Sequence, residues 1–247
     1  MKSRERAFTL VELLVVVGII ALLISILLPA LSKARNQAVK VQCAAQLRQW
    51  GMALANYAGE NKGTFPYNGT PKGTWCPIGG KDVSWTSTIV LQFVGDYLIK
   101  NRSLTDLGKN NMMFCPLQIY HRDATVAYDP TLQDGLLGYF YMPHRNSKSG
   151  ENILNYAPPT NVDGVGWVEK KKFAQTYKFA PIMSDMLQYD VTRGWNYYSS
   201  HVGKAAVPEG GNFLFEDGHV KWYRFDQIDV GAEGGGWKCN YKVSYNW

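Results

Sequence analysis

The chain has 247 residues, which is enough for a long helix and either one globular domain or two small ones. It carries 26 basic and 20 acidic side chains, a net charge of +6, which becomes +4 once residues 1–7 are removed. This charge is diffuse, and no basic run exceeds Lys170 to Lys172, so the composition argues against nucleic acid as a partner.

The first element is an apolar stretch behind a short basic leader. Residues 13–31 carry no charge, and a helix of this length nearly covers a hydrocarbon core of about 30 Å. Because Lys2, Arg4 and Arg6 precede the stretch, we expect a cytoplasmic N-terminus and an exported chain after Lys33.

Glu12 stands at the start of this apolar run. A carboxylate there is costly unless a positive charge neutralises it. A plain membrane anchor has no use for such a group, whereas a helix that packs beside copies of itself can pair it with a neighbour's N-terminal amine. That pairing requires the chain to be cut just before Phe8.

These residues resemble the type IV prepilin signal, in which a basic leader and a small residue precede Phe-Thr-Leu-Val-Glu-Leu-Leu. The resemblance implies cleavage after Ala7 and N-methylation of Phe8, and Ala7 departs from the usual glycine. It also implies assembly roles for Glu12, at the fifth mature position, and for Pro29, at the twenty-second. Two other interpretations stay open: an uncleaved anchor, and a secretory signal peptide cut near 32–34, although its apolar region would be unusually long.

The pattern predicts one helix over residues 8–58, with a transmembrane part at about 10–31. A break at Pro29 is the alternative. The second half is amphipathic and should lie on the globular domain, residues 59–247, because apolar residues recur at spacings of four, three, four and three. These residues are Cys43, Leu47, Trp50, Leu54 and Tyr57.

Residues 59–247 predict an α+β domain with an antiparallel sheet and long loops. The expected elements are a short helix over 84–100, with Trp85, Ile89, Phe93 and Leu98 on one side, strands within 112–117, 136–142 and 179–186, and an exposed excursion over 143–166.

Asp217-Gly218 predicts a hairpin with a two-residue loop. That register pairs Phe215 with Val220. It also pairs Phe213 with Trp222 on the same apolar face, which the sheet can bury against the long helix.

Three downstream blocks add to the resemblance, namely residues 46–57, residues 114–116 and residues 211–222. The last block resembles a C-terminal motif of prepilin-like proteins in which a histidine precedes Asp-Gly by about nine residues. Here fifteen residues separate His201 from Asp217, so the resemblance requires an insertion near 205–209.

The four cysteines lack the short spacing of a zinc knuckle. Outside the cytoplasm an even number favours disulfides, and four cysteines allow three connectivities. The preferred pairs are Cys43 with Cys115, which would tie the long helix to the body, and Cys76 with Cys239.

A catalytic site would have to gather Asp185, His201, Asp217 and His219. The chain has no His-Glu-x-x-His, nucleophile elbow or phosphate loop, and the turn already explains Asp217. We therefore expect no catalytic residues, no cofactor and no metal, with a structural calcium at Asp185 and Asp217 as the remaining candidate.

The resemblance implies a non-enzymatic structural subunit, a pilin or pseudopilin, of a type IV pilus or type II secretion filament. Its implied partners are a prepilin peptidase, an inner-membrane assembly platform, membrane lipid, and sister pilins or copies of itself in a helical filament. The protein would sit in the bacterial inner membrane with its domain in the periplasm before assembly. The alternative function is a surface-binding minor pilin or adhesin whose aromatic residues in 143–167 and 193–200 stack on sugars.

Overall fold

The computed structural model describes residues 9–67, 85–100, 111–117, 134–141, 143, 172–173, 181–190, 199–203, 206–229, 237–239 and 242–243. The chain divides into two compact units, residues 1–39 and residues 40–247. The secondary structure is α+β, as predicted, with one long N-terminal helix and antiparallel strands in the second unit.

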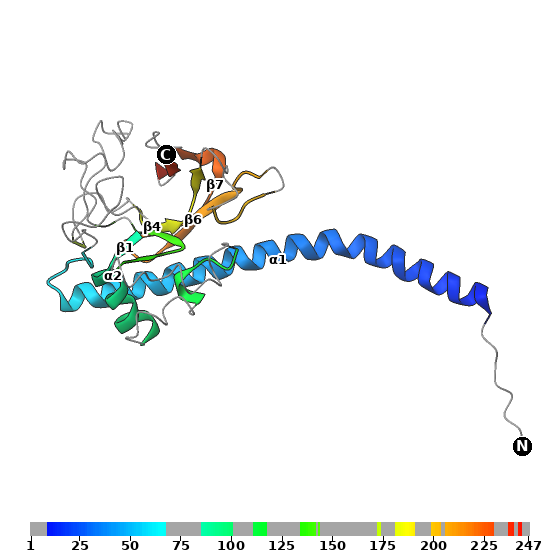
Figure 1. The fold of residues 1–247 in the computed structure, drawn as a ribbon, viewed down its shortest axis with the longest axis horizontal. Coiled ribbons are helices and arrows are strands. Elements are labelled where there is room, and N and C mark those ends of the chain that lie inside the picture. Colours follow the sequence, from blue (N-terminus) through cyan, green and yellow to red (C-terminus); the bar gives the residue numbers. More distant parts are fainter. Residues whose placement is uncertain are drawn as a thin grey trace, which may run out of the picture. The chain divides into compact units, whose positions relative to one another are not determined.

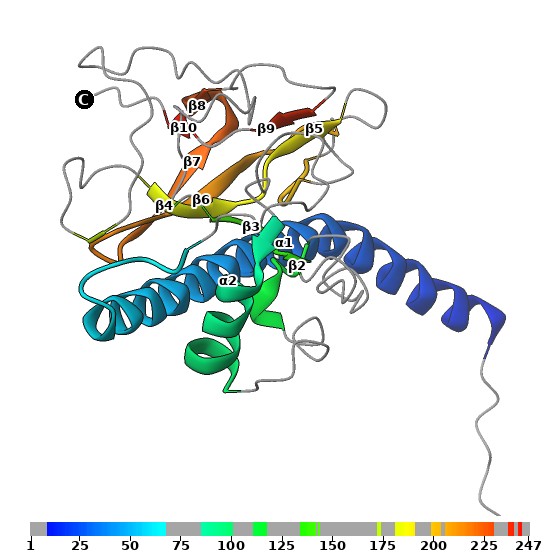
Figure 2. The same ribbon diagram turned by 60° about the vertical axis from the view of Figure 1, so that its left-hand side comes forward.

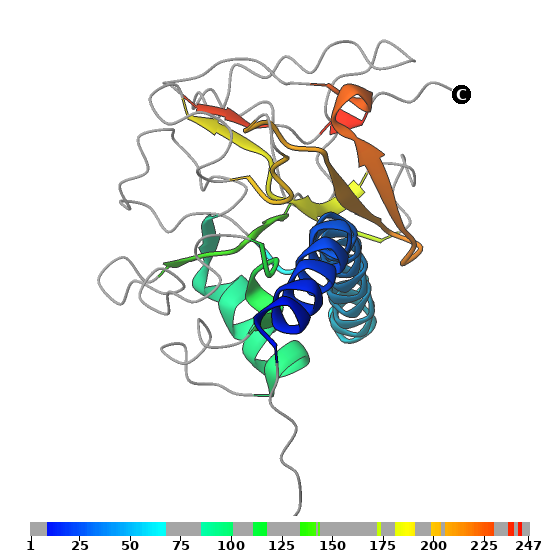
Figure 3. The same cartoon turned by 90° about the vertical axis from the view of Figure 1, so that its right-hand side faces the viewer.

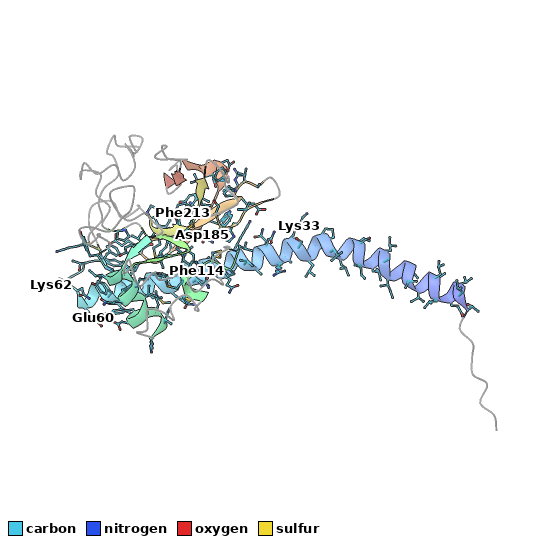
Figure 4. The ribbon with its side chains drawn as sticks, viewed as in Figure 1. Lys33, Glu60, Lys62, Phe114, Asp185 and Phe213 are labelled. Atoms are coloured by element: carbon cyan, nitrogen blue, oxygen red, sulfur yellow. A yellow bond between two sulfur atoms is a disulfide. The ribbon has the colours of Figure 1, made fainter. Side chains whose placement is uncertain are left out.

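Helix α1 runs from Leu10 to Glu60 without interruption. Pro29 lies inside it, so the alternative of two helices broken at that residue is wrong. In the first unit every large apolar side chain from Leu10 to Leu31 is exposed, and Figure 4 shows the side chains of this half, Lys33 among them, standing away from the helix. In the described part of the chain, α1 alone is long and apolar enough to cross a membrane.

The part of α1 in the second unit has a buried stripe at helical spacing, as the amphipathic pattern predicts. Figure 3 shows this part between the main sheet and helix α2. Tyr57 is only half-buried. The stripe consists of Cys43, Gln46, Leu47, Trp50, Gly51, Ala53, Leu54 and Ala58.

Four antiparallel strands make the main sheet, in the order β3-β4-β6-β7. Figure 2 shows these strands above the helix. The strands are β3 (Tyr139–Tyr141), β4 (Pro181–Asp185), β6 (Gly210–Phe215) and β7 (Val220–Arg224), followed by the short 3-10 helix η5 (Phe225–Gln227). Strands β3 and β4 fall within the predicted strands 136–142 and 179–186.

Three further antiparallel pairs surround this sheet, and Figure 2 shows two of them, β5 with β9 and β8 with β10, beyond its edge. The pairs are β1 (Trp85–Ser87) with β2 (Asp134–Leu136), β5 (Gln188–Asp190) with β9 (Trp237–Cys239), and β8 (Ile228–Asp229) with β10 (Lys242–Val243).

The predicted helix over 84–100 is divided. Its first residues form β1, and helix α2 (Thr88–Phe93) passes into a π-helix, η1 (Val94–Ile99), next to α1 in Figure 1. The predicted face is wrong at Ile89, which is exposed. Phe93 does face the core, with its ring 6.0 Å from that of Trp50 and 5.5 Å from that of Tyr57.

The strand end predicted within 112–117 is also wrong, because Asn111–Met113 form a 3-10 helix, η3, followed by a turn. Backbone carbonyls of this segment are used by tertiary contacts. The indole Nε1 of Trp50 donates to the Met112 carbonyl at 2.9 Å, and the Gly138 amide donates to the Met113 carbonyl at 2.8 Å.

The β6–β7 hairpin exists, but its predicted register is wrong by one residue. Leu214, not Phe215, pairs with Val220. The loop has three residues, because Gly218, with φ of +85°, donates to the Phe215 carbonyl at 3.0 Å while Phe215 pairs with His219.

Because of this slip, β6 turns the opposite face to the helix from the one predicted, whereas Val220 and Trp222 of β7 stay on the helix side. A Cβ built on Gly51 of α1 would stand 3.0 Å from Leu214, so Leu214 faces the helix. Asn212 lies two residues away on the same face, and its side chain donates to the Lys40 carbonyl of α1 at 3.3 Å. Phe213 packs on Tyr223 on the other face, with ring centroids 5.5 Å apart.

Candidate functional site

The first turn of α1 is closed by a reciprocal capping pair. The backbone amide and the hydroxyl of Thr9 donate to Oε2 of Glu12, at 2.9 and 2.7 Å. The amide of Glu12 donates to the Thr9 hydroxyl at 3.2 Å. This is a capping box, in which a threonine and a glutamate three residues later satisfy amides that a helix start leaves without partners.

Within the first unit, Glu12 therefore lies at the beginning of the apolar part of α1. The hydroxyl of Ser25 donates to the Leu22 carbonyl at 2.7 Å, so this polar side chain is satisfied within the helix. A surface this apolar is stable only when lipid or other apolar helices cover it. The predicted processing residues Ala7 and Phe8 lie outside the described residues.

A second group of predicted residues meets inside the second unit. Cys43 of α1 and Cys115, just after η3, form a disulfide with their Cα atoms 5.5 Å apart. This is one of the two pairs predicted from the sequence. For the other pair, Cys76 lies outside the described residues, as does the side chain of Cys239.

His201 and Asp185 complete this group. Nε2 of His201 lies 3.0 Å from Oδ2 of Asp185 and 3.6 Å from Sγ of Cys115. Both side chains of the His201–Asp185 pair are fully buried, and Figure 4 shows Asp185 among the interior side chains near Phe114 and Phe213. A buried polar pair needs further hydrogen bonds to offset its desolvation.

Those bonds come from Asn212 on β6. Its backbone amide and its side-chain Nδ2 donate to Oδ2 of Asp185 at 2.7 and 2.8 Å. The other oxygen, Oδ1, has no hydrogen-bond partner among the described residues, and neither has Nδ1 of His201. Tyr139 lies opposite Asp185 in the β3–β4 ladder, and burial raises the pKa of its hydroxyl well above the ordinary value.

The backbone of His201 is held in a left-handed conformation, with φ of +54°. Its carbonyl accepts from the Glu209 amide at 2.9 Å, and the preceding Ser200 amide donates to the Met186 carbonyl at 2.8 Å. The imidazole packs against Trp222 edge to face, at 5.1 Å between centroids. Tertiary contacts therefore impose a conformation that a non-glycine residue rarely adopts.

Asp217 and His219 form a separate pair in the exposed hairpin loop. Oδ1 of Asp217 accepts from the His219 amide at 3.1 Å and lies 2.5 Å from His219 Nδ1. The backbone hydrogen bond is the main cause that lowers the pKa of Asp217. The structure therefore makes two pairs of these four residues. Asp217 lies beyond the far end of β6 from Asn212, so Asp185 and Asp217 are not brought together as a calcium site requires.

Sequence reasoning missed three contributions. Thr9 caps Glu12, which the Thr-x-x-Glu spacing could have shown. Asn212 holds Asp185, and no sequence signal marks that contact. The meeting of His201 with Cys115 was also missed, because it depends on the folded path of a chain in which these residues are far apart.

One family model matches the chain. It is the prokaryotic N-terminal methylation motif, over residues 2–28. Neither curated proteins nor solved structures give a match. The matched residues include Glu12, the capped start of α1 and most of the exposed apolar part of that helix. The chain therefore carries the N-terminal methylation signal of type IV pilins and pseudopilins.

Proposed function

We propose that this protein is a non-enzymatic structural subunit of a type IV pilus-like or type II secretion filament. In this proposal a prepilin peptidase cuts between Ala7 and Phe8 and methylates the new amine. Before assembly the mature helix lies in the inner membrane, with the second unit in the periplasm. An assembly platform then extracts the helix into a bundle of sister helices.

One observation carries the proposal: the methylation motif lies largely on an apolar helix whose large apolar side chains from Leu10 to Leu31 are all exposed. Burial of apolar surface stabilises by about 25 cal/mol per Å². An exposed apolar helix of this kind is therefore strongly stabilised by contact with lipid or neighbouring helices in place of water. Lipid covers this apolar surface before assembly, and sister helices cover it in the filament.

Glu12 supports the assembly step. Its two hydrogen bonds from Thr9 both use Oε2, so Oε1 can accept from the Phe8 amine of a neighbouring subunit. Removing a charge from water into an apolar bundle is costly unless an opposite charge accompanies it. The pairing would therefore fix the register in which two helices pack.

The test compares Glu12→Ala and Glu12→Gln with the natural chain. We expect membrane insertion and a mature N-terminus at N-methylated Phe8 in all three, measured by fractionation and mass spectrometry. Both variants should yield few filaments, because both lack the negative charge. Ser25→Ala is the control and should assemble normally.

Glu12→Gln separates charge pairing from helix capping, because glutamine keeps an acceptor for the Thr9 amide. Normal filaments from Glu12→Gln, with loss only in Glu12→Ala, would refute charge pairing. A mature chain that begins at Met1 or beyond Ser32 would refute the filament proposal as a whole.

Genomic neighbourhood distinguishes a pseudopilin from a pilus subunit, since secretion genes favour the first and retraction genes the second. The sugar-binding alternative depends on loops that lie almost entirely outside the described residues. It stays a prediction, and loss of carbohydrate binding on Trp195→Ala would support it.

A further inference from the structure

The buried group at the Cys43–Cys115 disulfide has the composition of a metal site. Two sulfurs, one imidazole nitrogen and one carboxylate oxygen lie within 4.8 Å of one another, and all four residues are buried. Thiolate, imidazole and carboxylate are the ligands that zinc takes in proteins, and four ligands complete its usual tetrahedral site.

The distance between the sulfur and the nitrogen also suits zinc. In a tetrahedral site, with Zn–S about 2.3 Å and Zn–N about 2.0 Å, sulfur and nitrogen ligands stand about 3.5 Å apart. Sγ of Cys115 and Nε2 of His201 are 3.6 Å apart. The Asp185 carboxylate is adjacent to these atoms, because its Oδ2 lies 3.0 Å from Nε2 of His201.

The two oxygens of the Asp185 carboxylate differ: Oδ2 is held by hydrogen bonds, and Oδ1 is left for another partner. Asn212 holds Oδ2 with two hydrogen bonds, as outer-shell groups hold ligating carboxylates. Oδ1 is buried without a partner among the described residues, and such a group costs free energy unless something satisfies it.

We propose that the reduced form of this cluster binds one Zn²⁺ through Cys43, Cys115, His201 and Asp185. The disulfide and the zinc complex are then alternative closed states of the same site. Two thiolates and one carboxylate around Zn²⁺ leave the same net charge as a Cys₃His site, which proteins commonly bury. This inference does not depend on the filament function, and it departs from the prediction that the chain binds no metal.

The two states interconvert by a balanced reaction. Zn²⁺ displaces two protons from the thiols and forms two Zn–S bonds. When a small-molecule disulfide oxidises the complex, the two thiolates lose two electrons and join as the Cys43–Cys115 bond. The oxidant takes up those electrons and two protons, leaves as two thiols, and Zn²⁺ is released.

The test uses the full chain in detergent micelles, with Cys76→Ser and Cys239→Ser to remove the other thiols. The chain is reduced with a phosphine and titrated with Co²⁺, then with Zn²⁺. We expect one Co²⁺ per reduced chain, with intense tetrahedral bands and thiolate-to-cobalt charge transfer, all lost on adding Zn²⁺. The oxidised chain should show none of these bands, and X-ray absorption of the zinc form should show two sulfur and two nitrogen or oxygen ligands.

Substitutions then identify the ligands. His201→Ala and Asp185→Asn should lose the tetrahedral bands. Asn212→Ala should weaken binding about 10- to 100-fold, because it removes one of the two hydrogen bonds that hold Asp185. His219→Ala, which removes an exposed histidine, is the matched control and should bind normally. A cooperative unfolding transition like that of the natural chain, followed by circular dichroism, shows that a variant still folds.

Three results would overturn the proposal: no stoichiometric metal in the reduced natural chain, unchanged binding in a folded His201→Ala or Asp185→Asn variant, or equal binding to the oxidised chain. Any of them would leave Asp185 and His201 as a buried polar pair beside a structural disulfide.

Discussion

Two aspartates of this chain each lie beside a histidine, and the two pairs differ in their contribution to stability because one is exposed and the other is buried. The side chains of Asp217 and His219 are 69% and 52% exposed, and solvent-exposed pairs of this kind contribute about 0–1 kcal/mol. Those of Asp185 and His201 are both 0% exposed. Removing one partner of a buried pair costs about 3–5 kcal/mol, because the other is left buried without compensation.

Asp217 gives the chain a weak dependence of stability on acid. Hydrogen bonding from the His219 amide lowers the pKa of Asp217 below its ordinary value of 3.8. The carboxylate therefore stabilises the fold at pH values above 3.8, and this contribution is lost as the pH falls through the lowered pKa. We expect urea midpoints of the natural chain and Asp217→Asn to differ slightly at neutral pH and to converge in acid. A difference that grows as the pH falls below 3.8 would contradict this sign.

At the scale of the element, β6 is buried along its whole length. Its helix-facing side meets Gly51 and Lys40 of α1, and its other side packs on Tyr223. A strand buried on both faces gives no alternation from which its register can be read. The loop decides the register instead, because Gly218 in a left-handed conformation lengthens it to three residues.

The start of β6 depends on a glycine. A Cβ at Gly210 would lie 2.1 Å from the Tyr223 carbonyl oxygen, and its φ of +151° disfavours other residues. We expect Gly210→Ala to lower the free energy of unfolding by about 3 kcal/mol or more. Gly59→Ala in α1 is the control, since nothing lies within 4 Å of that position, and it should raise stability by up to about 1 kcal/mol. Chemical denaturation of both variants measures the contrast, and similar effects would refute it.

At the scale of the whole molecule, the disulfide joins α1 to a segment 72 residues later. Both cysteines belong to the second unit, so the bond stabilises that unit whatever surrounds the first. Trp50 reinforces the same junction through its hydrogen bond to Met112. The second half of α1 is therefore an integral part of the globular core.

Closing a loop of this length removes unfolded-state entropy worth about 4 kcal/mol. We expect the double variant Cys43→Ala with Cys115→Ala to lose that amount under oxidising, metal-free conditions, measured by urea unfolding of the chain in micelles. Cys76→Ser with Cys239→Ser serves as the comparison for the other predicted pair. An unchanged midpoint in the Cys43–Cys115 double variant would show that the bond contributes nothing to stability.

Local sequence patterns were sufficient to predict much of the structure of this protein. An uncharged stretch, a leader and a glutamate at fixed spacing predict the signal and the helix, because each depends on neighbours along the chain. Periodicity likewise predicted the buried stripe from Cys43 to Leu54. The predictions of a helix over 84–100 and of a strand end near 112–117 were wrong. There, β1 pairing and the Trp50 hydrogen bond override local preference.

The spacing of prepilin-signal residues is a property of consecutive residues, so the amino-acid order alone determined the N-terminal signal and the long helix. Folding decided the hairpin register and the meeting of Cys43, Cys115, Asp185 and His201. These side chains come from separate parts of the chain, and only the packing of the sheet on α1 brings their ligand atoms within 4.8 Å of one another. No local pattern can encode a convergence that depends on the whole path of the chain.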